Sequence, residues 1–272
     1  MQTDNELRSA VLIVFIIIAV IVFLTAIVNI QETQSLNNTI VNPKTIGEMV
    51  GKKTIEGDVP LVHIYEYGRY VPYMVVDKQP NSSVMLIRKE PTNDTVQFND
   101  VSVFSSQYNY YPDSNLDVWL NDEFVQRFSE PMQEAILDTR IEVTSLETLL
   151  KNEENSKKDI VWRRVFVLST SEYGKDNIMT VLKEGRKIKN LILEEDRQVE
   201  WTRSPFNDGT SMFSCAIDGK NIIQMSVDER LKVRPAFTVS PLLAIEKRED
   251  PITGEEYFVL FSTDKNGNKI YF

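Results

Sequence analysis

The chain has 272 residues, 42% of them hydrophobic and 26% charged, with 30 lysines and arginines against 40 aspartates and glutamates and a net charge of −10. This acidic balance argues against general nucleic-acid binding, because a protein that holds phosphates gains most of its affinity by replacing their counterions with Lys and Arg. The 10% of aromatic residues and the average hydrophobic content indicate a folded core. One Cys and one His leave little material for disulfides, Cys/His metal sites or Ser-His-Asp triads.

The first thirty residues predict a membrane anchor. Residues 10–30 form an uncharged apolar run, and a helix needs about 20 residues to cross the hydrocarbon core. The preceding stub, residues 1–9, is not basic, and no small-residue cleavage site follows the run, so we expect an uncleaved anchor rather than a signal peptide. A short stub before a long domain favours an N-terminus inside the cell and a C-terminal domain outside.

Beyond the anchor we expect a stalk and one domain. Residues 31–44 are rich in Gln, Asn, Thr and Ser and predict a polar stalk, and residues 45–272 form the expected domain. The domain opens with three predicted strands, over residues 61–68, 69–76 and 83–89. Pro72 predicts that the second of these lies at a sheet edge or carries a bulge, because proline cannot donate to the ladder.

A helical middle follows these strands. Leucine and phenylalanine at every fourth position predict a helix over residues 114–128, and Ser114 provides a capping side chain at its start. A second, shorter helix is predicted over residues 130–137, because proline is favoured in a first turn. A strand over residues 161–170 and a helical candidate after Ser171 complete this part.

The C-terminal part returns to short strands. They are predicted over residues 200–205, 212–218, 221–227 and 232–239, with Asp218 and Gly219 as a hairpin turn. A three-stranded meander with turns at Thr253–Gly254 and Asn266–Gly267 ends the chain. Strands that flank a helical middle, rather than alternating with helices, predict an α+β fold.

Four ordered motifs carry a resemblance to a known family. They are Trp119-Leu120-Asn121, the string VFVLS at residues 165–169, WTRSP at residues 201–205 and VRPAF at residues 233–237. In order and spacing they resemble an uncharacterised extracellular domain family of Gram-positive bacteria whose usual strings are WLN, VFLLS, WLRSP and GVRPA. The resemblance covers about residues 65–239. Thr202 and Lys232 depart from the family's usual Leu and Gly.

That family looks like a branch of the C-type lectin-like and formylglycine-generating-enzyme-like superfamily. The resemblance implies a mixed fold in which loops above a small twisted antiparallel sheet carry any binding site. Sulfatase-activating members use two cysteines, and lectin members hold calcium with Glu-Pro-Asn or Gln-Pro-Asp loops, whereas this sequence has only Cys215 and lacks those loops at the corresponding place. We therefore predict no metal and no cofactor.

The predicted ligand site is the turn after residue 205. In lectin-like folds the variable loops precede the final strands, and here Asn207 and Asp208 offer short polar groups while Phe206 and Phe213 can supply an apolar floor. An ordinary turn is the alternative. Structural roles are predicted for five residues of the shared motifs: Trp119, Asn121, Trp201, Arg203 and Arg234.

Anchor, stalk and lectin-like head together favour a non-catalytic binding or interaction module in the cell membrane of a bacterium, facing outward, with a glycan or protein ligand. The alternative is an envelope enzyme, a glycosidase or transferase, that uses paired carboxylates. Glu194, Glu195 and Asp196 could present such carboxylates, although a solvated loop edge is the simpler interpretation. An accessory subunit of a larger envelope assembly is the third possibility.

Overall fold

The computed structural model describes residue 20 and residues 42–272, except 55–57, 103–106, 152–156, 176–181, 189–190, 192–197 and 220. The predicted stub, most of the predicted anchor and stalk, and the acidic tract at 194–196 lie outside the described residues, as does most of the helical candidate after Ser171. Within the described ranges, no helix is both long enough and apolar enough to span a bilayer.

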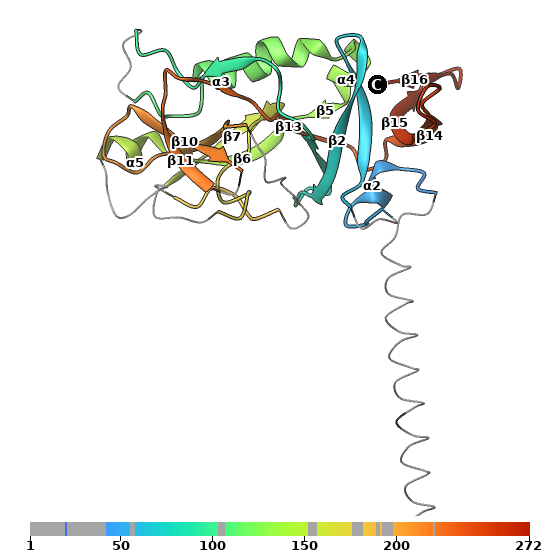
Figure 1. Cartoon of the computed structure of the whole chain (residues 1–272), viewed down its shortest axis with the longest axis horizontal. Helices are drawn as coiled ribbons and strands as arrows, with labels where there is room; N and C mark the ends of the chain where they lie inside the picture. Colours follow the sequence, from blue (N-terminus) through green and yellow to red (C-terminus); the bar gives the residue numbers. More distant parts are fainter. Residues whose placement is uncertain are drawn as a thin grey trace, which may run out of the picture.

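A mixed sheet forms the larger layer of the domain (Figure 1). Its strand order is β14-β15-β1-β2-β3-β13-β5, with β16 beside β15 and β8 beside β13. Neighbouring strands are antiparallel except β1 and β15, which are parallel. The strands are β1 (Leu61–Glu66), β2 (Arg69–Lys78), β3 (Val84–Arg88), β5 (Ile136–Leu137), β8 (Val165–Phe166), β13 (Ala236–Val239), β14 (Ala244–Glu249), β15 (Glu256–Thr263) and β16 (Lys269–Tyr271).

A second sheet and a separate strand pair lie toward the other end of the domain from the β14–β16 meander (Figure 1). The second sheet has the order β11-β10-β9-β12-β4, and β6 pairs with β7. The strands are β4 (Thr95–Gln97), β6 (Thr139–Thr144), β7 (Lys158–Arg163), β9 (Glu200–Pro205), β10 (Phe213–Asp218), β11 (Asn221–Ser226) and β12 (Arg230–Lys232). The strand predicted over 232–239 is therefore split, because the chain crosses from β12 in one sheet to β13 in the other.

The helical middle begins where it was predicted. The Ser114 hydroxyl accepts a hydrogen bond from the Asp117 amide at 3.2 Å and caps the first turn. The segment then changes from α-helix to a π-helical turn and a 3₁₀ turn, so it is not one regular helix. The elements are α2 (Ile46–Met49), α3 (Asn115–Val118), η1 (Trp119–Phe124), η2 (Val125–Arg127), α4 (Glu130–Ala135) and α5 (Leu146–Lys151).

The helical segment packs its aromatic face against the large sheet. Phe128 meets Phe124 at a centroid distance of 5.5 Å and Phe237 of β13 at 5.4 Å. Tyr73 of β2 lies 5.2 Å from the ring of Phe237. These rings belong to one apolar core that also includes Val62, Leu86 and Leu120. The leucines and phenylalanines that predicted the helix thus face the core.

The α+β class is confirmed, but one detail of the prediction is wrong. The prediction had one small sheet, whereas the described residues form two sheets and a strand pair. Of the two alternatives predicted from Pro72, the sheet edge is excluded, because strand β2 pairs with both β1 and β3, whereas the bulge is present. Pro72 is tolerated there because the β2–β3 ladder ends at Tyr73, and the bulge lies a few residues further on, at Val75–Asp77.

Candidate functional site

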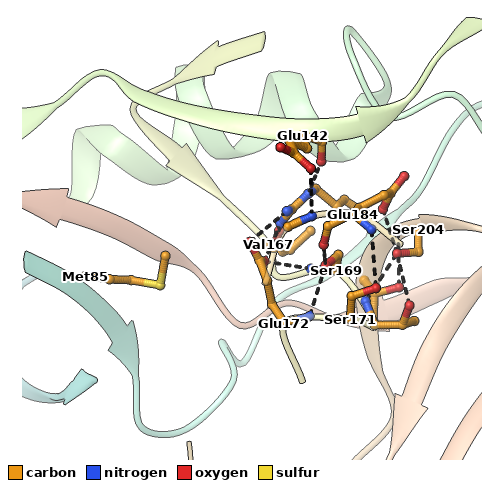
Figure 2. A network of polar contacts seen from close by, with 12 residues as sticks. Met85, Glu142, Val167, Ser169, Ser171, Glu172, Glu184 and Ser204 are labelled. Atoms are coloured by element: carbon orange, nitrogen blue, oxygen red, sulfur yellow. Dashed lines mark hydrogen bonds and ion pairs between the residues drawn. The ribbon is translucent and has the colours of Figure 1, made fainter. Parts of the chain in front are cut away.

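A buried polar network links β6, β9 and the loop after β8 (Figure 2). Arg203 of β9 is fully buried, and its guanidinium donates to both oxygens of Glu172, at 2.6 Å and 2.8 Å. It also donates to the carbonyls of Glu142, at 3.1 Å, and Val167, at 2.9 Å. This planar donor fork ties three chain segments together.

Glu184 is the second carboxyl of this network, and it is fully buried. One oxygen accepts from the amide and the hydroxyl of Thr144, at 2.6 Å and 2.7 Å, and the other accepts from the Ser204 hydroxyl at 2.7 Å. Burial raises the pKa of Glu184, with nearby Arg203 acting in the opposite direction. The Ser169 hydroxyl donates to the Glu184 carbonyl, so the backbone of this loop is fixed as well.

A hollow of about 350 Å³ opens next to this network. We call it the Trp162 hollow. Met85, Ile141 and Ile188 form a buried apolar floor, and Figure 2 shows Met85 on β3 standing apart from the network. Trp162 of β7, whose residue surface is 58% exposed, stands at its rim. The remaining lining residues are polar or small: Asp77, Gln79, Pro80, Asn81, Thr139, Arg140, Glu142, Glu172, Gly185 and Arg186.

The three carboxylates that line the Trp162 hollow are already engaged. Asp77 pairs with Arg186 at 2.9 Å, Glu142 pairs with Lys158 at 2.8 Å, and Glu172 is held by Arg203. The hydrogen bond from Lys158 lowers the pKa of Glu142, although partial burial opposes it. Each of the three carboxylates therefore has a cationic side chain as its partner, which gives the hollow walls of fixed geometry.

A second, more open hollow of about 390 Å³ also has Trp162 in its wall. Asp117 in its wall is held by Arg163 at 2.7 Å and by the Asn121 amide at 3.1 Å. Trp162 is therefore a lining residue of both hollows. The described residues contain no group of three or more His, Cys, Asp or Glu side chains placed to hold a metal ion.

The structure places the four predicted ligand residues elsewhere, at the turn between β9 and β10. Asn207 and Asp208 are exposed, and Phe206 and Phe213 are half-buried. The Asp208 carboxylate is used within the turn, accepting from the Thr210 amide at 2.9 Å. None of the four lines either hollow, so this site stays a prediction.

Two of the motif residues hold strands together: Arg234 joins the two sheets, and Trp201 joins two strands of the second sheet. Arg234 lies in the crossing between β12 and β13, and its Nε donates to Glu200 of β9 at 2.8 Å. Its Nη1 donates to the Arg88 carbonyl of β3 at 2.9 Å. Trp201 is fully buried and donates from its indole nitrogen to the Val96 carbonyl of β4 at 2.7 Å.

Asn121 and Trp119 hold the helical segment. The Asn121 side chain forms the two hydrogen bonds that a neighbouring strand would form with β8. Its oxygen accepts from the Val165 amide at 3.1 Å, and its nitrogen donates to the Val165 carbonyl at 3.0 Å. Trp119 is half-buried, with its ring 5.7 Å from Phe124 and under the Arg127 guanidinium at 5.2 Å. These contacts serve the architecture and leave both residues outside the Trp162 hollow.

Sequence reasoning missed the Trp162 hollow. One signal was available, since Lys158, Ile160 and Trp162 alternate with three less exposed residues along β7. That alternation places Trp162 on an outer strand face. The remaining walls come from the β2–β3 turn, β6 and the 185–188 loop, which no local pattern brings together.

Comparison with known proteins identifies the family. Residues 82–241, more than half of the chain, match the family described as a domain of unknown function, DUF6273, and the chain belongs to that family. The matched region contains β3–β13 and most of the hollow, while β1, β2 and the β14–β16 meander lie outside it. No curated protein and no solved structure shows a significant match to the chain.

Proposed function

We propose that this chain is a non-catalytic binding module of a bacterial cell envelope and that its ligand occupies the Trp162 hollow. The observation that carries the proposal is the combination of an exposed Trp162, a buried apolar floor and a polar rim in one cavity. Ligand sites have this composition, with apolar surface for affinity and a few polar groups for orientation.

The ion pairing of the carboxylates in the hollow favours binding over catalysis. A glycosidase of the common two-carboxylate type needs one carboxylic acid kept protonated by a raised pKa. Here Lys158 lowers the pKa of Glu142, and Asp77 and Glu172 are held by arginines. Glu184, whose pKa burial raises, is fully enclosed and does not line the hollow.

The envelope location and the lectin-like fold are parts of the same proposal. The apolar run at residues 10–30 supports an anchor, and the four motifs support the lectin-like resemblance. Protease added to intact cells is expected to remove the domain, because the stalk before it is polar. Digestion that occurs only after lysis would instead place the domain inside the cell.

Binding can be tested with the full chain in detergent micelles. We expect it to cosediment with isolated envelope fragments and expect Trp162→Ala to reduce the bound fraction at least tenfold. Ile160→Ala is the matched control, because Ile160 lies two residues away on the same face of β7, is 42% exposed and lines neither hollow. Equal binding by both variants and the unchanged chain would contradict the proposed site.

A further inference from the structure

We propose that the ligand of the Trp162 hollow is a glycan built from 2-acetamido pyranose residues, with one sugar ring on the Trp162 indole and its acetamido group over the apolar floor. This inference rests on the proposed function and narrows it to a ligand class. It is carried by three features of the cavity: its exposed aromatic face, its small buried floor and its amide-bearing rim.

Trp162 offers the face for a sugar ring. The residue is 58% exposed, and Arg140 lies directly opposite it across the β6–β7 pair. An indole presents a flat apolar surface together with one N–H donor, and a pyranose ring presents an apolar C–H face bordered by hydroxyls. Within the described part of the chain the Trp162 N–H has no protein partner, so it remains available to a hydroxyl.

The floor and the rim match the three parts of an acetamido group. Its methyl group suits the contact surface of Met85, Ile141 and Ile188, which are each less than 5% exposed. Its carbonyl and N–H need one donor and one acceptor, which the Gln79 and Asn81 amides on the rim can provide. The Asn81 oxygen already accepts from Ser83, at 2.7 Å and 3.1 Å, which orients the amide and leaves its nitrogen as the donor.

Charge and size favour an uncharged glycan over a charged partner. The three carboxylates in the wall face four cations, Arg140, Lys158, Arg186 and Arg203, so the local charge is nearly balanced. A volume of about 350 Å³ lies at the small end of ligand sites, roughly 300–1,000 Å³, and suits one or two sugar rings. The second hollow, which Trp162 also lines, gives a longer glycan room to continue.

Calorimetry on the full chain, in a detergent without a sugar headgroup, provides the test. The two probes are a β-1,4-linked tetramer of N-acetylglucosamine and the β-1,4-linked tetramer of glucose, which has the same linkage but no acetamido groups. We expect the first to bind at least tenfold more tightly than the second. Trp162→Ala and Arg140→Ala should each weaken binding of the first, and Ile160→Ala should leave it unchanged.

Three results would overturn the inference. Equal affinity for both tetramers would remove the role of the acetamido group, and unchanged affinity in both Trp162→Ala and Arg140→Ala would place the sugar elsewhere. The third is binding of neither tetramer. If Trp162-dependent binding to envelope fragments then persists and is destroyed by protease treatment of the fragments, the ligand is a protein, and the proposed binding function still stands.

Discussion

The buried network around Arg203 and the Trp162 hollow share Glu142 and Glu172, yet they differ in how their polar groups are used. In the network, Arg203 and Glu184 are fully buried and each is met by several partners at hydrogen-bond distance. In the hollow, Trp162 and Asn81 are exposed residues that line a cavity with an apolar floor. Satisfied buried polar groups specify the fold, whereas accessible donors above an apolar floor are available to a ligand.

The largest expected effect comes from breaking the network. Replacing Arg203 with Met leaves Glu172 as a partly buried charge without its partner, and loss of one member of a buried pair costs about 3–5 kcal/mol. Urea denaturation should show this loss in the free energy of unfolding. The double variant Arg203→Met, Glu172→Met should recover part of it. A single-variant loss below about 1 kcal/mol would mean that the pair acts like an exposed one.

The second effect is a pH dependence of the free energy of unfolding, which comes from Glu184 in the buried network. Because burial raises the pKa of Glu184 above 4.5, the folded state binds this proton more tightly than the unfolded state. Its stabilising contribution is present below pH 4.5 and is lost as the pH rises through the folded-state pKa. The free energy of unfolding of the natural chain should therefore fall with rising pH relative to Glu184→Gln, which cannot titrate. A relative increase would contradict the assigned direction.

Arg140 provides the matched contrast to Arg203. Its side chain is 53% exposed, and its nearest carboxylate contact, to Glu142, is 3.8 Å long. Surface changes of this kind usually shift stability by no more than about 0.5 kcal/mol, so Arg140→Ala should unfold at nearly the same urea concentration as the natural chain. A loss comparable to that of Arg203→Met would show that the rim, too, serves the fold.

The smallest effect is expected at the turn that the sequence had suggested as the ligand site. The double variant Asn207→Ala, Asp208→Ala removes the hydrogen bond to the Thr210 amide but no buried group. We expect a stability change of about 0.5 kcal/mol or less and undiminished binding to envelope fragments. Loss of binding with unchanged stability would move the site from the Trp162 hollow to this turn.

Much of the local structure follows from the sequence. Strands β1, β2 and β3, the Asp218–Gly219 hairpin and the final meander lie where alternation and turn residues predict them. The helical segment starts at Ser114 because a hydroxyl at that position satisfies a free amide of the first turn. Helix α5 was missed, because its short segment carries no distinct apolar period, and strand β6 was missed although Ile141 and Val143 alternate with polar residues along it.

What the sequence by itself determined is therefore local: the class of fold, most of the strands and the family motifs. Tertiary structure alone decided which residues share a cavity, because Asn81, Arg140, Trp162 and Ile188 come from four separate segments that meet only after the sheets have formed. It also decided that the arginines of two motifs face buried glutamates. Periodicity reports which face of an element is apolar, but long-range packing decides what that face meets.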